Sequence, residues 1–340
     1  MIVNFNGGQR LRRCVQSVLK SHLPNIEVIV IDNHSTDSSI SSLSDFSNET
    51  TPLRVIRNEK NLGPAVARNV GIAVCEGKHV AFLDNDTEVD PGWLVQPLTI
   101  MEGDPSVGAC QSKLLLMDEP HKLDYVGDYL GPYGFLIQRA RHGESDEGQF
   151  DSVEEIFTAK SASMIVRRSV LEEIGRFDPE YFMYLEETDL CWRIWLRGFR
   201  VILTPKSLVW HAFGTTREIL PRESERLIMY HGCKNYVRTL IKNLELRGLL
   251  RILPLHLLLW SGIAVWMLVH KRTRSATFVL EGLLWNARHL KSTLRARRQV
   301  QQFVRRRSDA EIFKSISRRS NIAQHYYKLA RAPPESSYHA

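Results

Sequence analysis

The sequence has no cysteine framework. Five cysteines occur among its 340 residues, an odd number with no C-x-x-C pair, and this usage excludes a disulfide scaffold and a structural zinc site. We therefore expect isolated thiols in a reducing compartment. No secretory leader precedes the first expected strand, because the chain starts almost at once with Met-Ile-Val-Asn-Phe-Asn. Either that strand is unusually short or the true start lies upstream of Met1.

The composition also lacks the bias of a disordered chain, with 43% hydrophobic and 24% charged residues. Charge is distributed unevenly. From Lys271 to the end there are 16 Lys and Arg against 4 Asp and Glu, whereas the rest has 29 against 34. A basic tail beside an acidic globular part is typical of proteins that bind nucleic acid or an anionic membrane surface.

Short β-branched runs alternate with helical stretches up to about residue 90. Strands are expected at 27–31, 53–57 and 79–83, and helices at 9–21 and 63–74. This alternation predicts an α/β fold with a mostly parallel central sheet flanked by helices. In such sheets, ligand-binding residues follow the carboxyl ends of the strands. Asn4, Asp32 and the triplet Asp84-Asn-Asp86 should therefore meet at one crevice.

The following part of the chain is less regular. Residues 117–149, rich in Gly, Tyr and acids, look like an insert or a flexible loop. A strand at 157–166 should lead into a helix at 169–175, and strands at 199–203 and 208–211 should follow. We expect these elements to continue the same domain.

An acidic run, Tyr-Leu-Glu-Glu-Thr-Asp-Leu-Cys-Trp-Arg at 184–193, sets three carboxylates in an aromatic and apolar background. Carboxylates in apolar surroundings bind protons more tightly, which suits a general base. Glu186, Glu187 and Asp189 would equally stabilise the start of a helix. Asp189 could also pair with Arg193 one turn later. The run alone leaves both interpretations open.

Asp84 and Asp86 follow a hydrophobic strand with one residue between them. Such a pair suits Mg²⁺ or Mn²⁺ bound through oxygen and shared with phosphates. The cation would neutralise a diphosphate leaving group. His211, at the end of a later strand, could add an imidazole ligand. Each feature alone is common in turns or among structural histidines, so the metal site depends on their occurring together.

Residues 252–269 form an apolar segment without formal charge, flanked by basic residues on both sides. Its length is at the lower limit for a membrane span, about 18 residues. We expect a helix in the membrane interface, with Trp260 and Trp266 at headgroup depth; a buried helical hairpin is the alternative. The basic stretch 288–307 suits anionic lipid, and its sparse aromatics argue against a nucleic-acid partner.

Six ordered motifs occur within roughly residues 1–240. They are Val3-Asn-Phe-Asn-Gly7, Asp32-Asn-His-Ser-Thr-Asp-Ser38, Asn61-Leu-Gly63 with Ala67-Arg-Asn-Val-Gly71, Leu83-Asp-Asn-Asp86, Gly175-Arg-Phe-Asp178, and the stretch 182–193, followed by His211 and Gly214. In these motifs the chain resembles the family 2 glycosyltransferases, which have the A-type nucleotide-diphospho-sugar transferase fold. It is most similar to their rhamnosyltransferase-like branch.

The resemblance implies a binding role for five residues. Asp32 would contact the nucleotide base. Asn4, Asn61 and Arg68 would line the nucleotide and diphosphate site, although a helical arginine such as Arg68 could also be a solvated surface charge. Asp84 would face the ribose or the metal ion.

The resemblance also implies the catalytic groups. Asp86 would ligate the metal, and His211 would complete its shell. The general base would be Glu187, with Glu186 beside it raising its proton affinity, and a single base on one face implies inversion. Glu187 stands where the family usually has Asp, so its carboxylate reaches about a methylene further. Ser161-Ala162 stands where the family usually has Gly-Ala, and the serine could narrow the pocket.

The sequence thus predicts a catalytic domain over 1–240, with a nucleotide-sugar half at about 1–116 and an acceptor half at about 150–240. A membrane-associating helical tail would follow at 241–340. We expect an inverting, metal-dependent hexosyltransferase at the cytoplasmic face of the cell membrane. It would move rhamnose or another hexose from a nucleotide-diphosphate donor to a glycan or lipid-linked acceptor.

The sequence leaves one alternative function open and argues against another. A non-catalytic module that binds nucleotide sugars or a membrane surface is the alternative. A processive polysaccharide synthase is not expected, because the sequence has no Gln-x-x-Arg-Trp motif and no set of several spanning segments.

Overall fold

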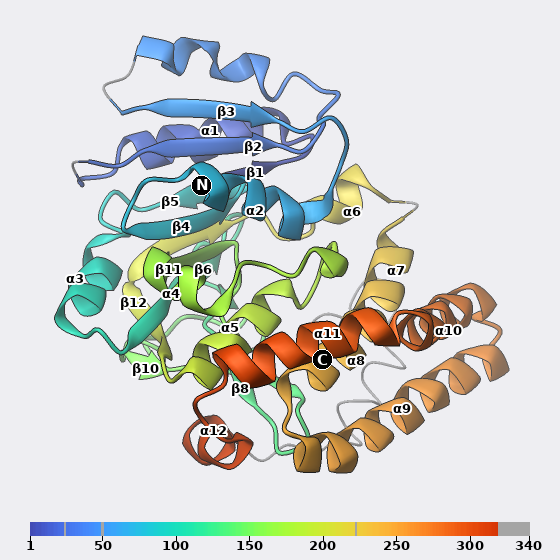
Figure 1. Ribbon diagram of the computed structural model, residues 1–340. Helices are drawn as coiled ribbons and strands as arrows, with labels where there is room; N and C mark the ends of the chain where they lie inside the picture. Colours follow the sequence, from blue (N-terminus) through green and yellow to red (C-terminus); the bar gives the residue numbers. More distant parts are fainter. Residues whose placement is uncertain (24, 49–50, 222, 319–340) are drawn as a thin grey trace.

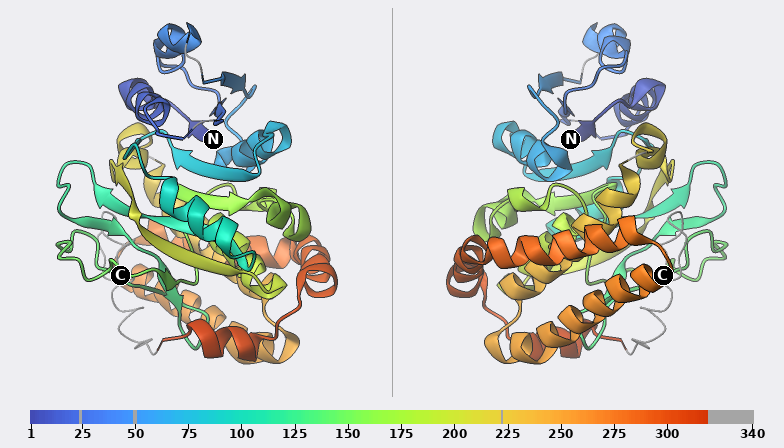
Figure 2. Two further views of the ribbon diagram at one scale, coloured as in Figure 1. Left: turned by 90° about the vertical axis from the view of Figure 1, so that its left-hand side faces the viewer. Right: turned by 90° about the vertical axis from the view of Figure 1, so that its right-hand side faces the viewer.

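A ten-stranded sheet forms the centre of the molecule (Figure 1), shown here as a computed structural model that describes residues 1–23, 25–48, 51–221 and 223–318. The strand order is β10-β12-β6-β11-β4-β1-β2-β3, with β5 added to β12 and β7 to β6. Helices α1 and α2 lie on opposite faces of the sheet, and the C-terminal helices α8–α12 gather beside its far half (Figure 2).

The strands and helices have the following bounds. The strands are β1 (Ile2–Asn4), β2 (Val28–Asp32), β3 (Leu53–Arg57), β4 (His79–Asp84), β5 (Thr87–Val89), β6 (Val107–Leu116), β7 (Leu123–Tyr125), β8 (Asp128–Leu130), β9 (Leu136–Gln138), β10 (Glu154–Glu155), β11 (Ser163–Arg167) and β12 (Arg200–His211). The α-helices are α1 (Gly8–Leu19), α2 (Gly63–Val74), α3 (Val95–Gly103), α4 (Arg168–Ile174), α5 (Glu186–Arg197), α6 (Thr215–Ile219), α7 (Ser224–Arg226), α8 (Gly232–Asn243), α9 (Leu246–Val269), α10 (Thr273–Arg288), α11 (Leu290–Gln299) and α12 (Asp309–Ile316). Two 3₁₀ turns, η1 (Ser41–Asn48) and η2 (Pro179–Tyr181), and two π-helical turns, η3 (Leu227–His231) and η4 (Val300–Val304), complete the elements.

The prediction of a mostly parallel sheet is wrong, because the sheet is mixed. Strands β4, β1, β2 and β3 are parallel, as the N-terminal alternation predicts. Strand β11, however, runs antiparallel to both of its neighbours, β4 and β6. A parallel neighbour needs a crossover element, usually a helix, and residues 117–162, which connect β6 to β11, contain only short strands. The chain therefore enters β11 in the opposite direction.

Two further strand predictions differ from the structure in their bounds. The strands expected at 199–203 and 208–211 are one long strand, β12, with a register shift between Thr204 and Leu208. Pro205 lies at this irregularity, where a residue without an amide hydrogen is tolerated. The strand expected at 157–166 begins only at Ser163.

Alternating side chains divide the core between the two faces of the sheet. In β11, Met164 and Val166 pack against α4 and α5, whereas Ile165 packs on the opposite face with residues of α1 and α3. This period of two is what a strand buried on both faces requires. Residues 117–149 join the first of these cores through Leu123 and Leu130, which are fully buried, so this stretch is packed structure and not a loose loop.

The C-terminal helices pack on the rest of the chain. The boundary expected between 240 and 241 falls inside α8, and Val300 and Val304 contribute to the same core as α5. Helix α9 forms a hairpin with α10, in which Trp260 is buried and Trp266 is half-buried. The predicted place of Trp260 at headgroup depth therefore disagrees with the structure, where the indole faces the helical core.

Candidate active site

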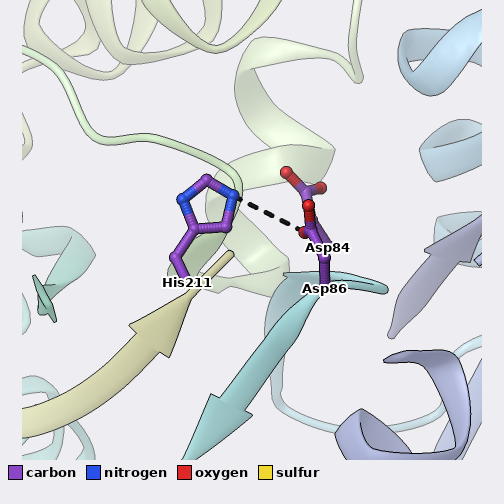
Figure 3. A group of neighbouring side chains, drawn as sticks. All are labelled: Asp84, Asp86 and His211. Atoms are coloured by element: carbon purple, nitrogen blue, oxygen red, sulfur yellow. Dashed lines mark ion pairs between the residues drawn. The ribbon is translucent and has the colours of Figure 1, made fainter. Parts of the chain in front are cut away.

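Two carboxylates and an imidazole meet where strands β4 and β12 end (Figure 3). The ligand atoms of Asp84, Asp86 and His211 all lie within 4.8 Å of one another. Pairing of β12 with β5 sets His211 opposite Thr87, which brings its Nε2 to 3.5 Å from Oδ1 of Asp86. We call these three residues the cation cluster. Its two carboxylates and one ring nitrogen match the ligands that Mg²⁺ and Mn²⁺ accept.

A buried carboxylate outside the predicted set orients the imidazole. Asp124, on β7, accepts a hydrogen bond from His211 Nδ1 at 2.9 Å and lies 3.1 Å from Nδ1 of His142. Burial alone would raise the pKa of Asp124. Lys160 and His211 lower it by more than burial raises it, so the pKa lies well below its usual range. A charged carboxylate can only accept, so His211 Nδ1 carries a proton, and Nε2 faces Asp86. Asp86 and Asp124 together raise the pKa of His211 well above 6.5, although burial opposes this.

The acidic pair Glu186 and Glu187 opens α5. Arg68 of α2 joins this pair to the cation cluster, since its guanidinium lies 2.8 Å from Glu186 Oε1 and 3.0 Å from Asp84 Oδ1. Arg68 is only 3% exposed, so it is not a solvated surface charge. Two regions about 100 residues apart in sequence thus form one site.

Glu187 has a proton affinity suited to a base. Burial and the adjacent Glu186 raise the pKa of Glu187 well above 4.5, and Arg68 offsets only part of this effect. The same run contains the expected structural pair, since Asp189 Oδ2 lies 3.0 Å from the Arg193 guanidinium. The structural pair expected in the acidic run is therefore confirmed, whereas the role of Glu187 as a base stays a prediction.

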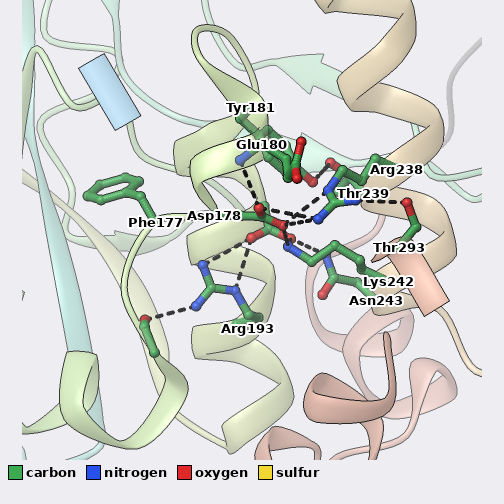
Figure 4. A network of polar contacts seen from close by, with 12 residues as sticks. Phe177, Asp178, Glu180, Tyr181, Arg193, Arg238, Thr239, Lys242, Asn243 and Thr293 are labelled. Carbon is green, nitrogen blue, oxygen red and sulfur yellow. Dashed lines mark hydrogen bonds and ion pairs between the residues drawn. The ribbon is translucent and has the colours of Figure 1, made fainter. Parts of the chain in front are cut away.

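A network of buried charges ties α5 to α8 (Figure 4). Lys242 Nζ lies 2.6 Å from Asp178 and 2.9 Å from Asp189, and Arg238 also contacts Asp178, at 3.0 Å. These side chains are at most 10% exposed. The start of the helix that bears the acidic pair is thus fixed against the C-terminal helices.

Amide side chains connect the cation cluster to the other predicted binding residues. Asn4 is fully buried; its Oδ1 accepts from Asn85 at 2.8 Å, and its Nδ2 lies 3.1 Å from Asp32. Asn33, next to Asp32, donates to Asn61 at 2.7 Å. The structure thus brings all the predicted site residues to one edge of the sheet, but the polar atoms of Asn4 are bonded within the protein.

Sequence reasoning missed several residues of this site. Asp124 lies in the stretch taken for an insert, and only its place between apolar Leu123 and Tyr125 hints at a buried strand. Asp178 stands in a quoted motif, Gly-Arg-Phe-Asp, without an expected role.

Comparison with known proteins gives one family. The sequence model of the family described as "Glycosyl transferase family 2" matches residues 1–175. The pre-mycofactocin glycosyltransferase of Mycobacterium tuberculosis is 31% identical over 214 residues, which make up 62% of this chain and 41% of that protein. The chain thus spans less than half the length of this relative.

Two solved structures share the fold at low sequence identity. TarS 1-349 of S. aureus superimposes with a TM-score of 0.52 and 17% identity, over 97% of this chain and 86% of that one. The mannosyltransferase PcManGT from Pyrobaculum calidifontis, solved in complex with GDP-Man and Mn²⁺, gives 0.52 and 14%, over 84% and 85%. At these identities the likeness concerns the fold alone.

Proposed function

The chain belongs to glycosyl transferase family 2, and from this membership we propose that it is an inverting hexosyltransferase using a nucleotide-diphosphate sugar. The observation that carries the proposal is the bridge through Arg68, which sets a cation cluster and an acidic pair side by side. PcManGT, with the same fold, was solved with GDP-Man and Mn²⁺, and this supports a similar donor and cation here.

The donor atoms of the cation cluster fit Mg²⁺ or Mn²⁺. When bound, such a cation would neutralise charge on the diphosphate leaving group. Asp84 and Asp86 contribute carboxylate oxygens, and His211 contributes Nε2, the ring nitrogen that faces Asp86 and not Asp124. Nearby, Asp32 would contact the nucleotide base, and Asn61 and Arg68 would line the nucleotide and diphosphate site.

Glu187 is the proposed general base. It removes the proton from the acceptor hydroxyl as that oxygen bonds to the anomeric carbon, while the bond from this carbon to the diphosphate oxygen breaks. Because the acceptor attacks opposite the leaving group, the configuration inverts. Glu186, which accepts a hydrogen bond from Arg68, lies beside Glu187 and raises its pKa. The longer side chain of glutamate lets the base reach out from the start of α5.

The C-terminal helices offer a surface for lipid. Exposed apolar side chains gather there: Leu246, Leu250, Leu258, Val265 and Val269 on α9, Leu280 and Leu284 on α10, and Leu290 and Leu294 on α11. Among the described residues, α9 is the one helix long and apolar enough to cross a membrane, judged by length and composition. Its other face packs on α8 and α10, which supports a helix lying in the interface.

This surface supports an acceptor carried by a lipid. Arg247, Arg251, Lys271 and Arg274, all exposed, flank the ends of α9 and would attract anionic headgroups. We propose that the part up to about residue 240 is catalytic and that the later helices, α9–α12, attach it to the cytoplasmic face of the cell membrane. Residues 319–340 of the predicted tail lie outside the described residues. The quoted motifs favour the rhamnosyltransferase-like branch and a role in cell-surface polysaccharide assembly.

A panel of nucleotide sugars tests the proposal. Purified protein with Mn²⁺ should hydrolyse or transfer at least one hexose donor, and chelation of the metal should abolish this. E187Q should lower the rate by about 100-fold or more, within the range for loss of a general base, while E173Q on the exposed face of α4 should not. Nucleotide-diphosphate binding without turnover over the whole panel would instead favour the non-catalytic binding module.

A further inference from the structure

Residues 181–185, directly before the acidic pair, form a turn with unusual backbone geometry. Phe182, Tyr184 and Leu185 have positive φ angles of 61°, 68° and 64°. L-residues with bulky side chains adopt this conformation only where their surroundings impose it. Leu185 is the residue immediately before α5, so its backbone angles set the direction in which the helix leaves the turn. We call this segment the 181–185 turn.

One side-chain amide of α8 holds this turn. Asn235 is fully buried, and its Nδ2 donates to three carbonyl oxygens: Tyr181 at 3.0 Å, Met183 at 2.8 Å and Tyr184 at 2.7 Å. Three acceptors around one NH₂ group fix the orientation of the amide, because its oxygen in the same place would face three other oxygens.

Three further contacts also hold the 181–185 turn in this conformation. One helical turn before Asn235, the His231 ring stacks on Phe182 with centroids 5.3 Å apart. One helical turn after it, Thr239 Oγ1 lies 2.6 Å from the hydroxyl of Tyr181. From the opposite side Gly63 comes so close that a Cβ there would lie 2.6 Å from the ring of Phe182.

We propose that Asn235 is a positioning residue, which places the carboxylate of Glu187 by imposing the strained 181–185 turn; the proposal rests on the function proposed above for Glu187. Asn235 reaches the base only through the backbone of the turn. Without its two N–H groups, the turn relaxes toward ordinary φ angles and the first residues of α5 shift. The cation cluster is held at the ends of β4 and β12, and its link to the start of α5 runs through the side chain of Arg68, so its ligand atoms keep their place.

Two substitutions at Asn235 and a matched control test this. N235D keeps the shape and replaces the donor with a carboxylate, and N235A removes the donor without adding charge. Asn286 on α10 is the control, since it is also buried and also donates to two backbone carbonyls, those of Lys234 and Gly282. Its described contacts do not include the turn.

We expect N235D and N235A to lower kcat at least thirtyfold while the donor KM and the Mn²⁺ affinity stay within about twofold. N286D and N286A should lower kcat no more than threefold. Hydrogen exchange should report the turn directly, with amides 182–187 exchanging at least tenfold faster in both Asn235 variants than in the Asn286 variants. If N235D melts below the assay temperature, N235A is compared with N286A instead.

The two readouts separate this proposal from the proposed function. If amides 182–187 exchange faster but kcat is unchanged, Asn235 does not position the base. If hydrogen exchange is unchanged in both Asn235 variants, Asn235 does not stabilise the 181–185 turn. A donor KM that rises in parallel with the loss of kcat would point to general misfolding of the site and also overturn it. If the wild type transfers no sugar, the role of Glu187 fails, while the exchange result still decides whether Asn235 holds the turn.

Discussion

At the scale of single residues, the raised pKa that suits Glu187 to act as a base also lowers the stability of the fold. Its pKa is raised well above 4.5 by burial and by Glu186. A carboxyl with a raised pKa in the folded state favours folding only while it is protonated, so the fold loses stability as the pH rises through that pKa. Near neutral pH, Glu187 therefore lowers the free energy of unfolding relative to a neutral side chain of the same shape.

Replacing Glu187 by glutamine should abolish transfer and also stabilise the protein. We expect a melting temperature at pH 7 that is higher by about 2 °C or more, the shift that about 1 kcal/mol produces in a chain of this size. Below pH 4 the gain should vanish, because both side chains are then neutral. Calorimetry at pH 7 and below pH 4 measures the difference; an E187Q protein that melts earlier at pH 7 would contradict it.

Asp124 acts on the cation cluster through His211 and does not belong to it. Loss of a carboxylate that orients a metal-bound imidazole commonly lowers metal affinity by about 10–100-fold, and we expect this of D124N in titrations with Mn²⁺. Asp128 provides the control, since it is equally buried near Tyr125, which donates to it at 2.8 Å. D128N should bind Mn²⁺ within about twofold of the wild type, and equal binding by D124N would refute the role of Asp124.

At the scale of elements, the connection between α5 and α8 is a buried ionic network centred on Lys242. Although burial raises the pKa values of Asp178 and Asp189, Lys242 lowers both, so that both lie below 3.8. These depressed pKa values add stability above pH 3.8, and this contribution is lost as the pH falls through them. The network therefore holds the acidic pair in place only where its aspartates are charged.

K242M should destabilise the fold by roughly 3 kcal/mol at pH 7, the lower end for breaking a buried ion pair, because Asp178 keeps Arg238 and Asp189 keeps Arg193. The difference from wild type should shrink as the pH falls below 3.8. K78M is the control, since Lys78 forms an exposed pair with Glu102 at 2.7 Å, and such pairs contribute about 1 kcal/mol or less. Urea unfolding at both pH values gives the comparison; equal losses in the two variants would count against the network.

Elements with a strong local pattern could be predicted, whereas tertiary pairings could not. Strands β2, β3 and β4 and helices α1 and α2 lie within about two residues of the expected bounds, because continuous apolar runs and helical spacing are local signals. The direction of β11 depends on how the chain returns to the sheet, which no local pattern records. Hydrophobic alternation specifies only the face that each side chain occupies.

The same distinction applies to the site. Asp84, Asp86 and Glu187 could be found from short motifs, because each follows or begins an element with a clear pattern. Asp124 and Asn235 could not be found in this way, because their roles depend on distant contacts. The partner of Asp124 is 87 positions away in sequence, and the partners of Asn235 are about 50 positions away. A polar residue in a short strand or a helix shows nothing in sequence about the group that it will hold.

At the scale of the whole molecule, helices α9, α10 and α11 lie away from strands β1–β3 (Figure 1). These helices carry the exposed apolar side chains named above. A monomer rarely exposes a large contiguous apolar surface without a partner. Because basic residues surround this surface, we propose an anionic lipid headgroup as its partner. The catalytic part would then work at a fixed distance above the membrane.

Substitution of three exposed side chains should weaken that attachment. Leu250, Leu258 and Val265 are 68%, 70% and 59% exposed, so a triple glutamine variant should fold normally. We expect its binding to anionic vesicles to fall at least tenfold, since about 1.5–3 kcal/mol accompanies the burial of each such side chain. V95Q on α3, also exposed, should bind as the wild type does; equal vesicle binding by the triple variant would exclude this surface.

The stereochemistry of the product tests the central claim most directly. The wild-type protein, supplied with Mn²⁺, a hexose donor identified from the panel and its acceptor, is followed by NMR of the anomeric proton before any mutarotation. A single base, Glu187, acting by direct displacement predicts a product whose anomeric configuration is opposite to that of the donor, and no product with E187Q. A product that retains the donor configuration, or one formed at the wild-type rate by E187Q, would contradict the account.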